Sequence, residues 1–234
     1  MPEPMLELND VVTYYGPIPA LKGISLHVRQ GEIVCLLGGN ASGKSTTMKT
    51  ILGVVRPHRG SVSFEDDRID GLPPQAIVRR GIALVPEGRR LFPSLTVEEN
   101  LLMGAAAGRA GPWNLERVYR LFPILGDRRD LPGTALSGGQ QQMAALGRAL
   151  MSNPRVLLCD ELSLGLAPIV IREIYQALPT ICAEGMTVVI VEQDVGMARQ
   201  VSGRIYCFQE GRVSLHGPSD TLTREQISRA YFGV

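Results

Sequence analysis

Eight consecutive residues of this sequence have the types and spacing of a phosphate-binding loop. The pattern G-x-x-x-x-G-K-[ST] is filled by Gly38, Gly39, Asn40, Ala41, Ser42, Gly43, Lys44 and Ser45. Glycines let backbone N–H groups turn inward around phosphate oxygens, and a helix that begins near Lys44 directs its positive end at the same anion. We expect Lys44 to reach the β- and γ-phosphates of a nucleotide and the Ser45 hydroxyl to ligate Mg²⁺, with contacts extending to Thr46. The flanking strand and helix argue against the alternative, a glycine-rich turn with a solvated lysine.

Two adjacent carboxylates, Asp160 and Glu161, directly follow the apolar residues 156–159. Such a run predicts a buried strand, and α/β sheets bind ligands at the carboxyl ends of their strands. Neighbouring carboxylates at a buried position are costly unless they are paired or face a cation. We predict that Asp160 holds Mg²⁺ and that Glu161 polarises the attacking water. The alternative is an ordinary acidic helix cap.

A second phosphate-binding feature is predicted upstream of these carboxylates. It consists of Leu136, Ser137, Gly138, Gly139 and Gln140. Ser137 can cap a helix, and the two glycines leave backbone N–H groups open at its N-terminus. Two phosphate sites for one nucleotide make sense if two chains sandwich it, each supplying one half. We therefore expect a head-to-tail dimer that clamps two ATP molecules, the alternative being a simple capped helix start.

Strands and helices alternate along the chain, which predicts an α/β fold with a parallel central sheet. Apolar or alternating segments predict strands at residues 5–14, 24–28, 32–37, 82–86, 156–159 and 186–191, and a terminal hairpin at 205–209 and 212–215. Helices are predicted at residues 44–52, over most of 98–151, at 169–184 and at 223–231.

The composition of the 234-residue chain excludes several classes of protein. Twenty-four basic and 23 acidic residues give a net charge of +1, which does not indicate a dominant nucleic-acid or membrane surface. No apolar run approaches the roughly 18 residues of a membrane helix, and the N-terminal residues do not resemble a signal peptide. We therefore expect a cytoplasmic protein whose four isolated cysteines are small apolar side chains in a reducing compartment: Cys35, Cys159, Cys182 and Cys207.

The phosphate loop, the 136–140 segment about 20 residues before the paired carboxylates, and the spacing between them resemble the ATP-binding cassette (ABC) ATPases. Further segments are similar to the LivF-type subunits of branched-chain amino acid importers, at residues 85–92, 96–101, 163–168, 191–194 and 230–233. The resemblance covers essentially the whole chain. It implies an ATPase subunit that uses ATP and Mg²⁺ and docks under a membrane permease. It also implies a second ATPase subunit and a periplasmic or surface substrate-binding protein as partners.

The resemblance also assigns roles to single residues. Tyr15 matches the aromatic residue that stacks on adenine, although a core aromatic is the alternative. Glu87 stands where a glutamine is usual and can contact Mg²⁺ or the water, and Gln193 stands where most ABC ATPases carry a histidine. Leu162 replaces a common proline. Arg89, Arg90, Phe92 and Leu95 match a permease-contacting segment, the alternative being a solvated basic pair with local packing.

These observations predict one ABC ATPase domain over residues 5–234. We expect a P-loop core at about 5–87 and 152–216 with a mostly parallel sheet and an N-terminal antiparallel β subdomain. An inserted α-helical subdomain is expected at about 88–151 and a C-terminal helix at about 217–234. The chain would energise import of branched-chain amino acids, with urea, amides and other amino acids open as cargo. A soluble ABC ATPase or an ATP-binding regulatory module is the alternative.

Overall fold

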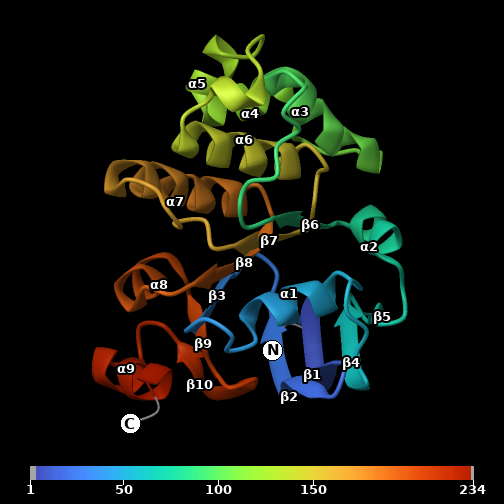
Figure 1. The fold of residues 1–234 in the computed structure, drawn as a ribbon, viewed down its shortest axis with the longest axis vertical. Helices are drawn as coiled ribbons and strands as arrows, with labels where there is room; N and C mark the ends of the chain where they lie inside the picture. Colours follow the sequence, from blue (N-terminus) through green and yellow to red (C-terminus); the bar gives the residue numbers. More distant parts are fainter. Residues whose placement is uncertain (1–3, 233–234) are drawn as a thin grey trace. The chain divides into compact units, whose positions relative to one another are not determined.

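A computed structural model describes residues 4–232 of the protein (Figure 1). The chain divides into two compact units, the first formed by residues up to 77 and from 187 onward, the second by residues 78–186. The first unit contains β1 (Leu6–Tyr15), β2 (Ile18–Val28), β3 (Ile33–Gly38), α1 (Lys44–Ile51), β4 (Arg59–Phe64), β5 (Asp67–Arg68), β8 (Thr187–Glu192), α8 (Val195–Val201), β9 (Arg204–Gln209), β10 (Arg212–Pro218) and α9 (Arg224–Phe232). Helix α2 (Pro74–Arg80) crosses the boundary. The second unit contains β6 (Ile82–Val85), α3 (Val97–Gly104), η1 (Ala105–Ala107), α4 (Leu115–Leu121), α5 (Pro123–Asp127), η2 (Gly133–Ala135), α6 (Gly138–Leu150), β7 (Val156–Asp160) and α7 (Pro168–Ala183).

Two sets of strands form the first unit. The N-terminal sheet is antiparallel, with the order β2-β1-β4-β5. In the other set, of order β10-β9-β3-β8, β3 runs parallel to β8 and β9 while β10 is antiparallel to β9. All of β8 and all of β3 after Ile33 is buried, as expected for parallel strands that read as continuous apolar runs.

The second unit pairs β6 with β7 in parallel and carries helices α3, α4 and α5 over α6 (Figure 1). Gly147 permits this close helix packing, because a Cβ atom there would lie 2.8 Å from Val118 and 2.9 Å from Leu101. The mostly helical segment expected from the sequence is therefore present. The predicted bounds of the core and of the helical subdomain stay a prediction.

The α/β fold class is confirmed, including the antiparallel N-terminal sheet and the parallel strands. The sequence reading did not identify β4, β5, α2 and α8, because none of these elements carries an apolar run longer than three residues. It also began the second strand at residue 24, whereas β2 begins at Ile18. Tyr15 already pairs with Ile18 across the tight turn at Gly16, so the strand resumes six residues earlier than its alternating pattern indicates.

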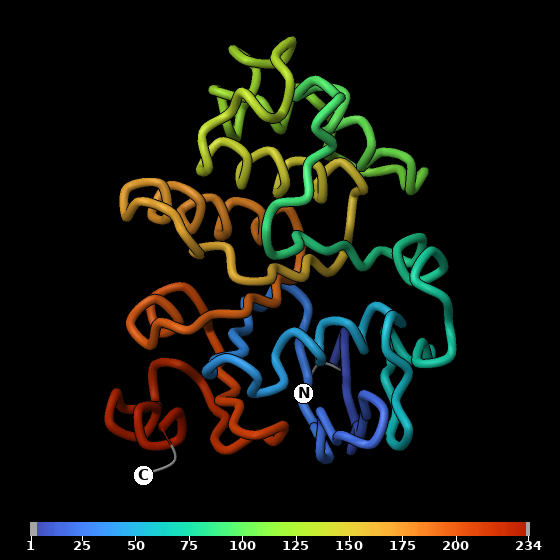
Figure 2. Tube along the Cα trace, in the orientation of Figure 1, coloured from blue at the N-terminus to red at the C-terminus, as the bar shows by residue number. Residues whose placement is uncertain are grey.

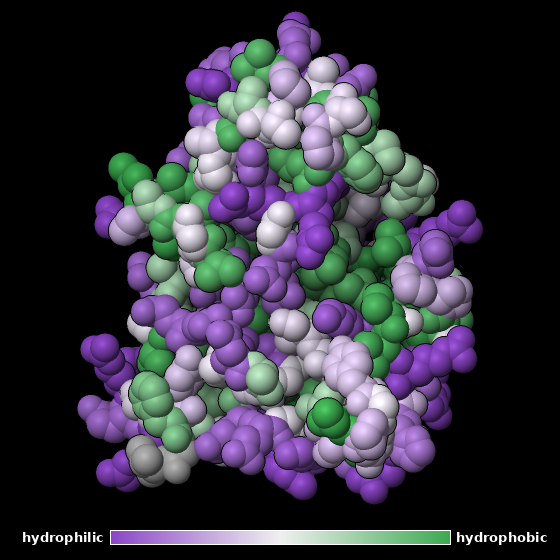
Figure 3. Space-filling model, viewed as in Figure 1, coloured by the Kyte–Doolittle hydropathy of each residue, from purple (hydrophilic) through white to green (hydrophobic). Residues whose placement is uncertain are grey.

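The described surface and thiols agree with the composition. Hydrophilic residues (purple) spread over the face shown in Figure 3, with hydrophobic residues (green) in smaller groups between them. No helix within residues 4–232 combines the length and apolarity needed to cross a bilayer.

The four cysteines are free thiols. Cys35, Cys159 and Cys207 are buried, and Cys182 is partly buried. Burial raises the pKa of Cys182 and of Cys207 to about 11, so both stay protonated at neutral pH.

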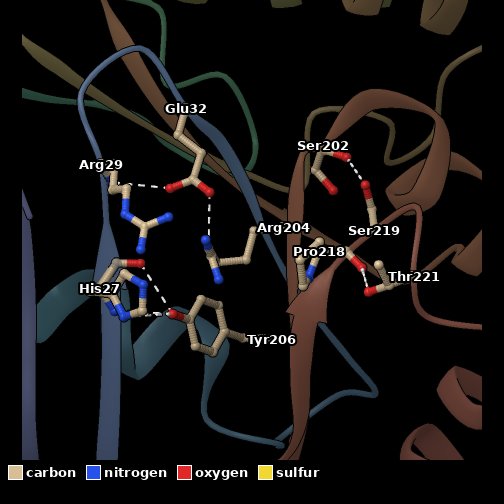
Figure 4. A network of polar contacts seen from close by, with 9 residues as sticks. All are labelled: His27, Arg29, Glu32, Ser202, Arg204, Tyr206, Pro218, Ser219 and Thr221. Atoms are coloured by element: carbon tan, nitrogen blue, oxygen red, sulfur yellow. Dashed lines mark hydrogen bonds and ion pairs between the residues drawn. The ribbon is translucent and has the colours of Figure 1, made fainter. Parts of the chain in front are cut away.

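A polar network in the first unit ties β2 to β9 (Figure 4). Arg204 Nε donates to Glu32 Oε1 at 2.9 Å, and the two side chains are only 12% and 17% exposed. The Tyr206 hydroxyl accepts from His27 N and donates to His27 O, each at 3.1 Å. Because the ion pair and the tyrosine are largely buried, the network fixes the end of β2 and the turn that follows it against β9.

His27 makes this network sensitive to pH. Burial first, and then the positive charges of Arg204 and Arg29, lower the pKa of His27 below 6.5, and within residues 4–232 its Nε2 is buried without a hydrogen-bond partner. The unfolded chain takes up this proton as the pH falls through about 6.5, and the folded chain does so only at lower pH. The free energy of unfolding therefore declines as the pH falls from about 7 toward the folded-state pKa.

We expect His27→Gln to weaken this decline. Urea unfolding at several pH values between about 5 and 7.5 measures it, and His58→Gln, at an exposed histidine of the same unit, is the matched control. An unchanged pH dependence in His27→Gln would show that another group carries the effect.

Candidate nucleotide site

The phosphate loop connects β3 to α1 in the first unit. Strand β3 ends at Gly38 and α1 begins at Lys44, with Gly43 as its N-cap at φ 112°. Lys44 is only 4% exposed, and its Nζ donates to Gly38 O at 2.6 Å and to Gly39 O at 2.7 Å. The loop is therefore wound around the ammonium group, which lies inside it and not in solvent.

Two positions show why the loop needs its small residues. A Cβ atom on Gly38 would lie 2.5 Å from Phe208 O and 2.7 Å from Ser42 Oγ, so only glycine fits there. Ala41 has a φ of 60°, a left-handed conformation that costs an L-residue other than glycine about 1–2 kcal/mol. The loop thus holds local strain at its turn, as backbones at ligand sites often do.

The residues of the loop fit a bound phosphate. Ser42 is 7% exposed, and its Oγ has no hydrogen-bond partner within the described part of the chain, so a buried hydroxyl is available at the loop. The first turn of α1 holds no acidic residue and its N-cap has no side-chain bond, which leaves the positive end of the helix to an external anion. Ser45 and Thr46, the next predicted contacts, lie in this same turn and are partly buried.

Gln193 is brought to the phosphate loop by the pairing of β3 with β8. It directly follows β8, and its Nε2 donates to Asn40 Oδ1 at 3.1 Å. The two residues are 153 positions apart in the chain, so this contact depends on the sheet and not on a local motif. Gln193 therefore lies beside the loop, as a residue that contacts the terminal phosphate must.

Tyr15 ends β1 opposite Ile18, and its side chain is 46% exposed. It is therefore not a core aromatic. Its stacking on adenine stays a prediction.

The predicted catalytic carboxylates end β7 in the second unit. Asp160 is the last residue of the strand and is 9% exposed. Glu161 follows with a φ of 51°, again a left-handed non-glycine residue, and Leu162 is buried behind it. No helix begins at these two carboxylates, so they do not form an ordinary acidic helix cap. The strained backbone of Glu161 directly after a buried strand is typical of a functional site. Among the described residues, no group of three or more acidic, histidine or cysteine side chains forms a metal site on its own.

The 136–140 segment forms the predicted capped helix start. Ser137 accepts from Gln140 N at 3.4 Å, and Gln140 Oε1 accepts from Ser137 N at 3.0 Å, which completes a capping box at α6. The Val170 side chain packs against Gly139, so closely that a Cβ atom on Gly139 would lie 2.4 Å from Val170 Cγ1. The guanidinium of Arg89 lies beside Gly138, so it adds positive charge at this helix terminus.

Arg148, which the sequence reading did not single out, holds the segment after Glu87. Gly88, Arg89 and Arg90 are all left-handed, and Arg148 donates to the carbonyls of Arg89 and Arg90 at 2.9 and 2.7 Å. Its guanidinium also lies 5.6 Å from the Phe92 ring centre. Glu87 and Arg90 are exposed, whereas Arg89 is partly buried against α6. The pair is therefore not simply solvated, and contact with a permease stays a prediction.

The predicted site residues fall into two sets. The first unit carries Tyr15, residues 38–46 and Gln193, and the second unit carries Glu87, residues 137–140, Asp160 and Glu161.

The sequence matches the ABC transporter family over residues 21–163. It is 44% identical to the high-affinity branched-chain amino acid transport ATP-binding protein BraG of Pseudomonas aeruginosa, over 98% of this chain and all of that protein.

Solved ATP-binding cassettes share the fold. A nucleotide-free cassette from an ABC transporter superposes with a TM-score of 0.82 at 28% identity, over 97% of this chain and 95% of that one. The ATP-binding cassette MJ0796, solved as a dimer in a post-hydrolysis state with ADP and phosphate, has a TM-score of 0.82 at 29% identity, over 92% of this chain and 99% of that one.

Proposed function

The chain belongs to the ABC transporter family of ATP-binding proteins, and we propose that it is the ATP-hydrolysing subunit of an importer for branched-chain amino acids. The observation that carries the proposal is the 44% identity to BraG over essentially the whole of both chains. The buried Lys44 in a wound phosphate loop, with Gln193 beside it, supports ATP as the ligand.

Each site residue then has a proposed task. Lys44 and the backbone N–H groups of residues 38–46 bind the phosphates, and Tyr15 stacks on the adenine. The metal that accompanies ATP supplies charge neutralisation, and Ser45, Asp160 and Glu87 are its proposed ligands. Glu161 accepts a proton from the attacking water. Ser137, Gly138, Gly139 and Gln140 bind the nucleotide that a second ATPase subunit holds.

The proposed partners follow from this division of labour. As an ATP-hydrolysing importer subunit, the chain is proposed to act on a separate membrane permease through which the cargo passes. The proposed location is the cytoplasmic face of the membrane, beneath that permease and beside the second ATPase subunit. A periplasmic or surface substrate-binding protein supplies the cargo.

Reconstitution tests the function. The chain is co-purified with its permease subunits and binding protein, placed in liposomes with ATP inside, and assayed for uptake of labelled leucine against urea and acetamide. ATP-dependent leucine uptake is expected. Uptake of urea alone would overturn the cargo, and ATP hydrolysis with no ATP-dependent uptake of any cargo would favour a soluble ABC ATPase. ATP binding without phosphate release would favour a regulatory module.

Gln193 offers a prediction about the γ-phosphate. Its amide can donate a hydrogen bond but cannot ionise, so Gln193→Ala is expected to lower ATP turnover roughly tenfold, the equivalent of one lost hydrogen bond to a charged group. Gln193→His should retain activity and gain an acidic limb in its pH–rate profile, because an imidazole titrates near 6.5.

Phosphate release at saturating ATP between about pH 5.5 and 8 measures both effects. Gln200→Ala, at an exposed glutamine of α8, is the matched control. Native turnover in Gln193→Ala would mean that the residue only packs against Asn40.

A further inference from the structure

A cavity of about 440 Å³ opens on the N-terminal antiparallel sheet of the first unit. We call it the basic cavity, because three of its lining residues are cations and, among the described residues, none is acidic. None of its lining residues belongs to the predicted nucleotide contacts or to the 230–233 segment, of which Gly233 lies outside the described residues. Its lining includes Val12, Tyr14, Lys22, His58, Arg59 and Arg212.

The strand register places two of these cations on one face of the sheet. Val12 of β1 pairs with Lys22 of β2 on one side and with Arg59 of β4 on the other. Residues directly opposite each other in a sheet point to the same face, so Lys22 and Arg59 flank Val12 at the cavity. With strands about 4.8 Å apart, the two Cα atoms lie on the order of 10 Å from each other. Two long side chains at that spacing can both reach an anion placed between them.

The third cation, Arg212, is brought beside Lys22 by β10. Arg212 is the first residue of β10, and its Nη1 donates to Lys22 O at 2.9 Å. Strand β10 contacts β2, and in Figure 2 the orange-red turn before β10 lies beside the blue β2. Three strands far apart in the chain, β2, β4 and β10, therefore each contribute one cation to the same cavity.

The protein does not neutralise these cations. Arg59 pairs with Asp10 at 2.9 Å, but the two side chains are 65% and 61% exposed, and a pair so exposed contributes little. Within residues 4–232, neither Lys22 nor Arg212 has a carboxylate partner. Like charges gathered in one cavity repel each other, and an anion from outside the chain would relieve that repulsion.

Two rings form the aromatic side of the cavity. The ring centres of Tyr14 and His58 lie 5.4 Å apart with their planes at 85°, the edge-to-face arrangement that aromatic pairs prefer. Successive residues of a strand point to opposite faces, so Tyr14 points away from the face that presents Tyr15. The basic cavity therefore lies on the face opposite the predicted adenine contact, and its rings offer an apolar surface to an organic group.

We propose that the basic cavity binds a phosphorylated small molecule. A phosphate ester carries about two negative charges at neutral pH and three acceptor oxygens, which match the donors of Lys22, Arg59 and Arg212. The organic part of the ligand packs on the rings of Tyr14 and His58. The volume of the cavity falls within the roughly 300–1,000 Å³ of small-molecule sites. This site is additional to the proposed ATP site, and its ligand is not the hydrolysed nucleotide.

The test must separate the basic cavity from the phosphate loop, because main-chain bonds connect the two. Lys22 N donates to Gly211 O at 2.8 Å, and Gly211 N donates to Ser42 O at 2.9 Å. Phenyl phosphate is therefore titrated by calorimetry, at low ionic strength, into the native chain and into Lys44→Ala. Phenol is the uncharged control ligand. We expect phenyl phosphate to bind to both chains, and phenol to bind at least tenfold more weakly.

Lys22→Gln is the decisive variant, because it removes a charge that has no ion-pair partner within the described part of the chain. In the Lys44→Ala background we expect the Kd for phenyl phosphate to rise about tenfold, the effect of one lost charge-assisted contact. The thermal midpoint without ligand should not change. Arg59→Gln should weaken binding in the same way and serves if the first variant does not fold. Lys49→Gln, at an exposed lysine of α1, is the matched control and should retain the affinity.

Three results would each overturn the proposal: unchanged affinity in both Lys22→Gln and Arg59→Gln, equal binding of phenol, or loss of phenyl phosphate binding in Lys44→Ala. The last result would assign the phosphate to the phosphate loop. Sedimentation with vesicles that contain phosphatidic acid distinguishes a lipid headgroup from a soluble ligand. Vesicle binding that Lys22→Gln abolishes, with no binding of phenyl phosphate, would overturn the soluble ligand.

Discussion

Lys44→Ala is expected to abolish measurable ATP hydrolysis and to weaken ATP binding at least tenfold. In the native loop the Lys44 ammonium is buried and bonded to the carbonyls of Gly38 and Gly39. Removing it would delete the proposed principal cationic contact to the phosphates and would leave two carbonyls without this donor. A charge-assisted contact is worth about 1.5–3 kcal/mol, which corresponds to roughly 10- to 150-fold in affinity. Equilibrium ATP binding and phosphate release measure the two effects.

Lys49→Ala is the matched control for this variant. Lys49 lies on the same helix α1, carries the same charge and is exposed. It should bind and hydrolyse ATP as the native chain does. The unfolding curve of Lys44→Ala without nucleotide separates a local loss from a misfolded loop. Unchanged ATP affinity and turnover in a folded Lys44→Ala would contradict the assignment of the phosphate loop.

The sequence predicts those parts of the site that are specified by short local motifs. The phosphate loop lies between an apolar strand and a helix that begins at Lys44, as the spacing of its glycines and lysine requires. The capping box at Ser137 is likewise a four-residue pattern, S-x-x-Q. In both segments the chemistry and the secondary structure are specified by neighbours in the chain.

Contacts between distant segments could not be predicted in this way. The bond from Gln193 to Asn40 exists because β8 pairs with β3, and Arg148 meets the carbonyls of Arg89 and Arg90 because α6 packs beside the segment after β6. Such pairings depend on the order of strands and on helix packing, which one sequence does not encode as a local pattern. The left-handed conformations of Ala41 and Glu161 also leave no signal, because neither residue is glycine.

The other large expected effect is a loss of ATP turnover on substitution of Glu161. Glu161→Gln keeps the size and the hydrogen-bonding capacity of the side chain but removes the carboxylate that can take a proton from water. Loss of a general base costs about 100- to 10,000-fold in turnover. ATP binding should persist, because the phosphate loop and Lys44 are intact. The variant should therefore accumulate as an ATP-bound dimer, which size-exclusion chromatography with ATP and Mg²⁺ detects as a shift from monomer to dimer.

The matched control for this variant is Glu173→Gln, which makes the same change of charge on an exposed position of α7. It should hydrolyse ATP at the native rate and show no ATP-dependent dimer beyond that of the native chain. Glu161 has a strained, left-handed backbone after a buried strand. Because glutamine has nearly the same size, Glu161→Gln should keep this backbone conformation and remove only the proton acceptor. Native turnover in Glu161→Gln would assign the base to another carboxylate. Glu87, the exposed acidic residue that stands where a glutamine is usual, would be tested next by Glu87→Gln.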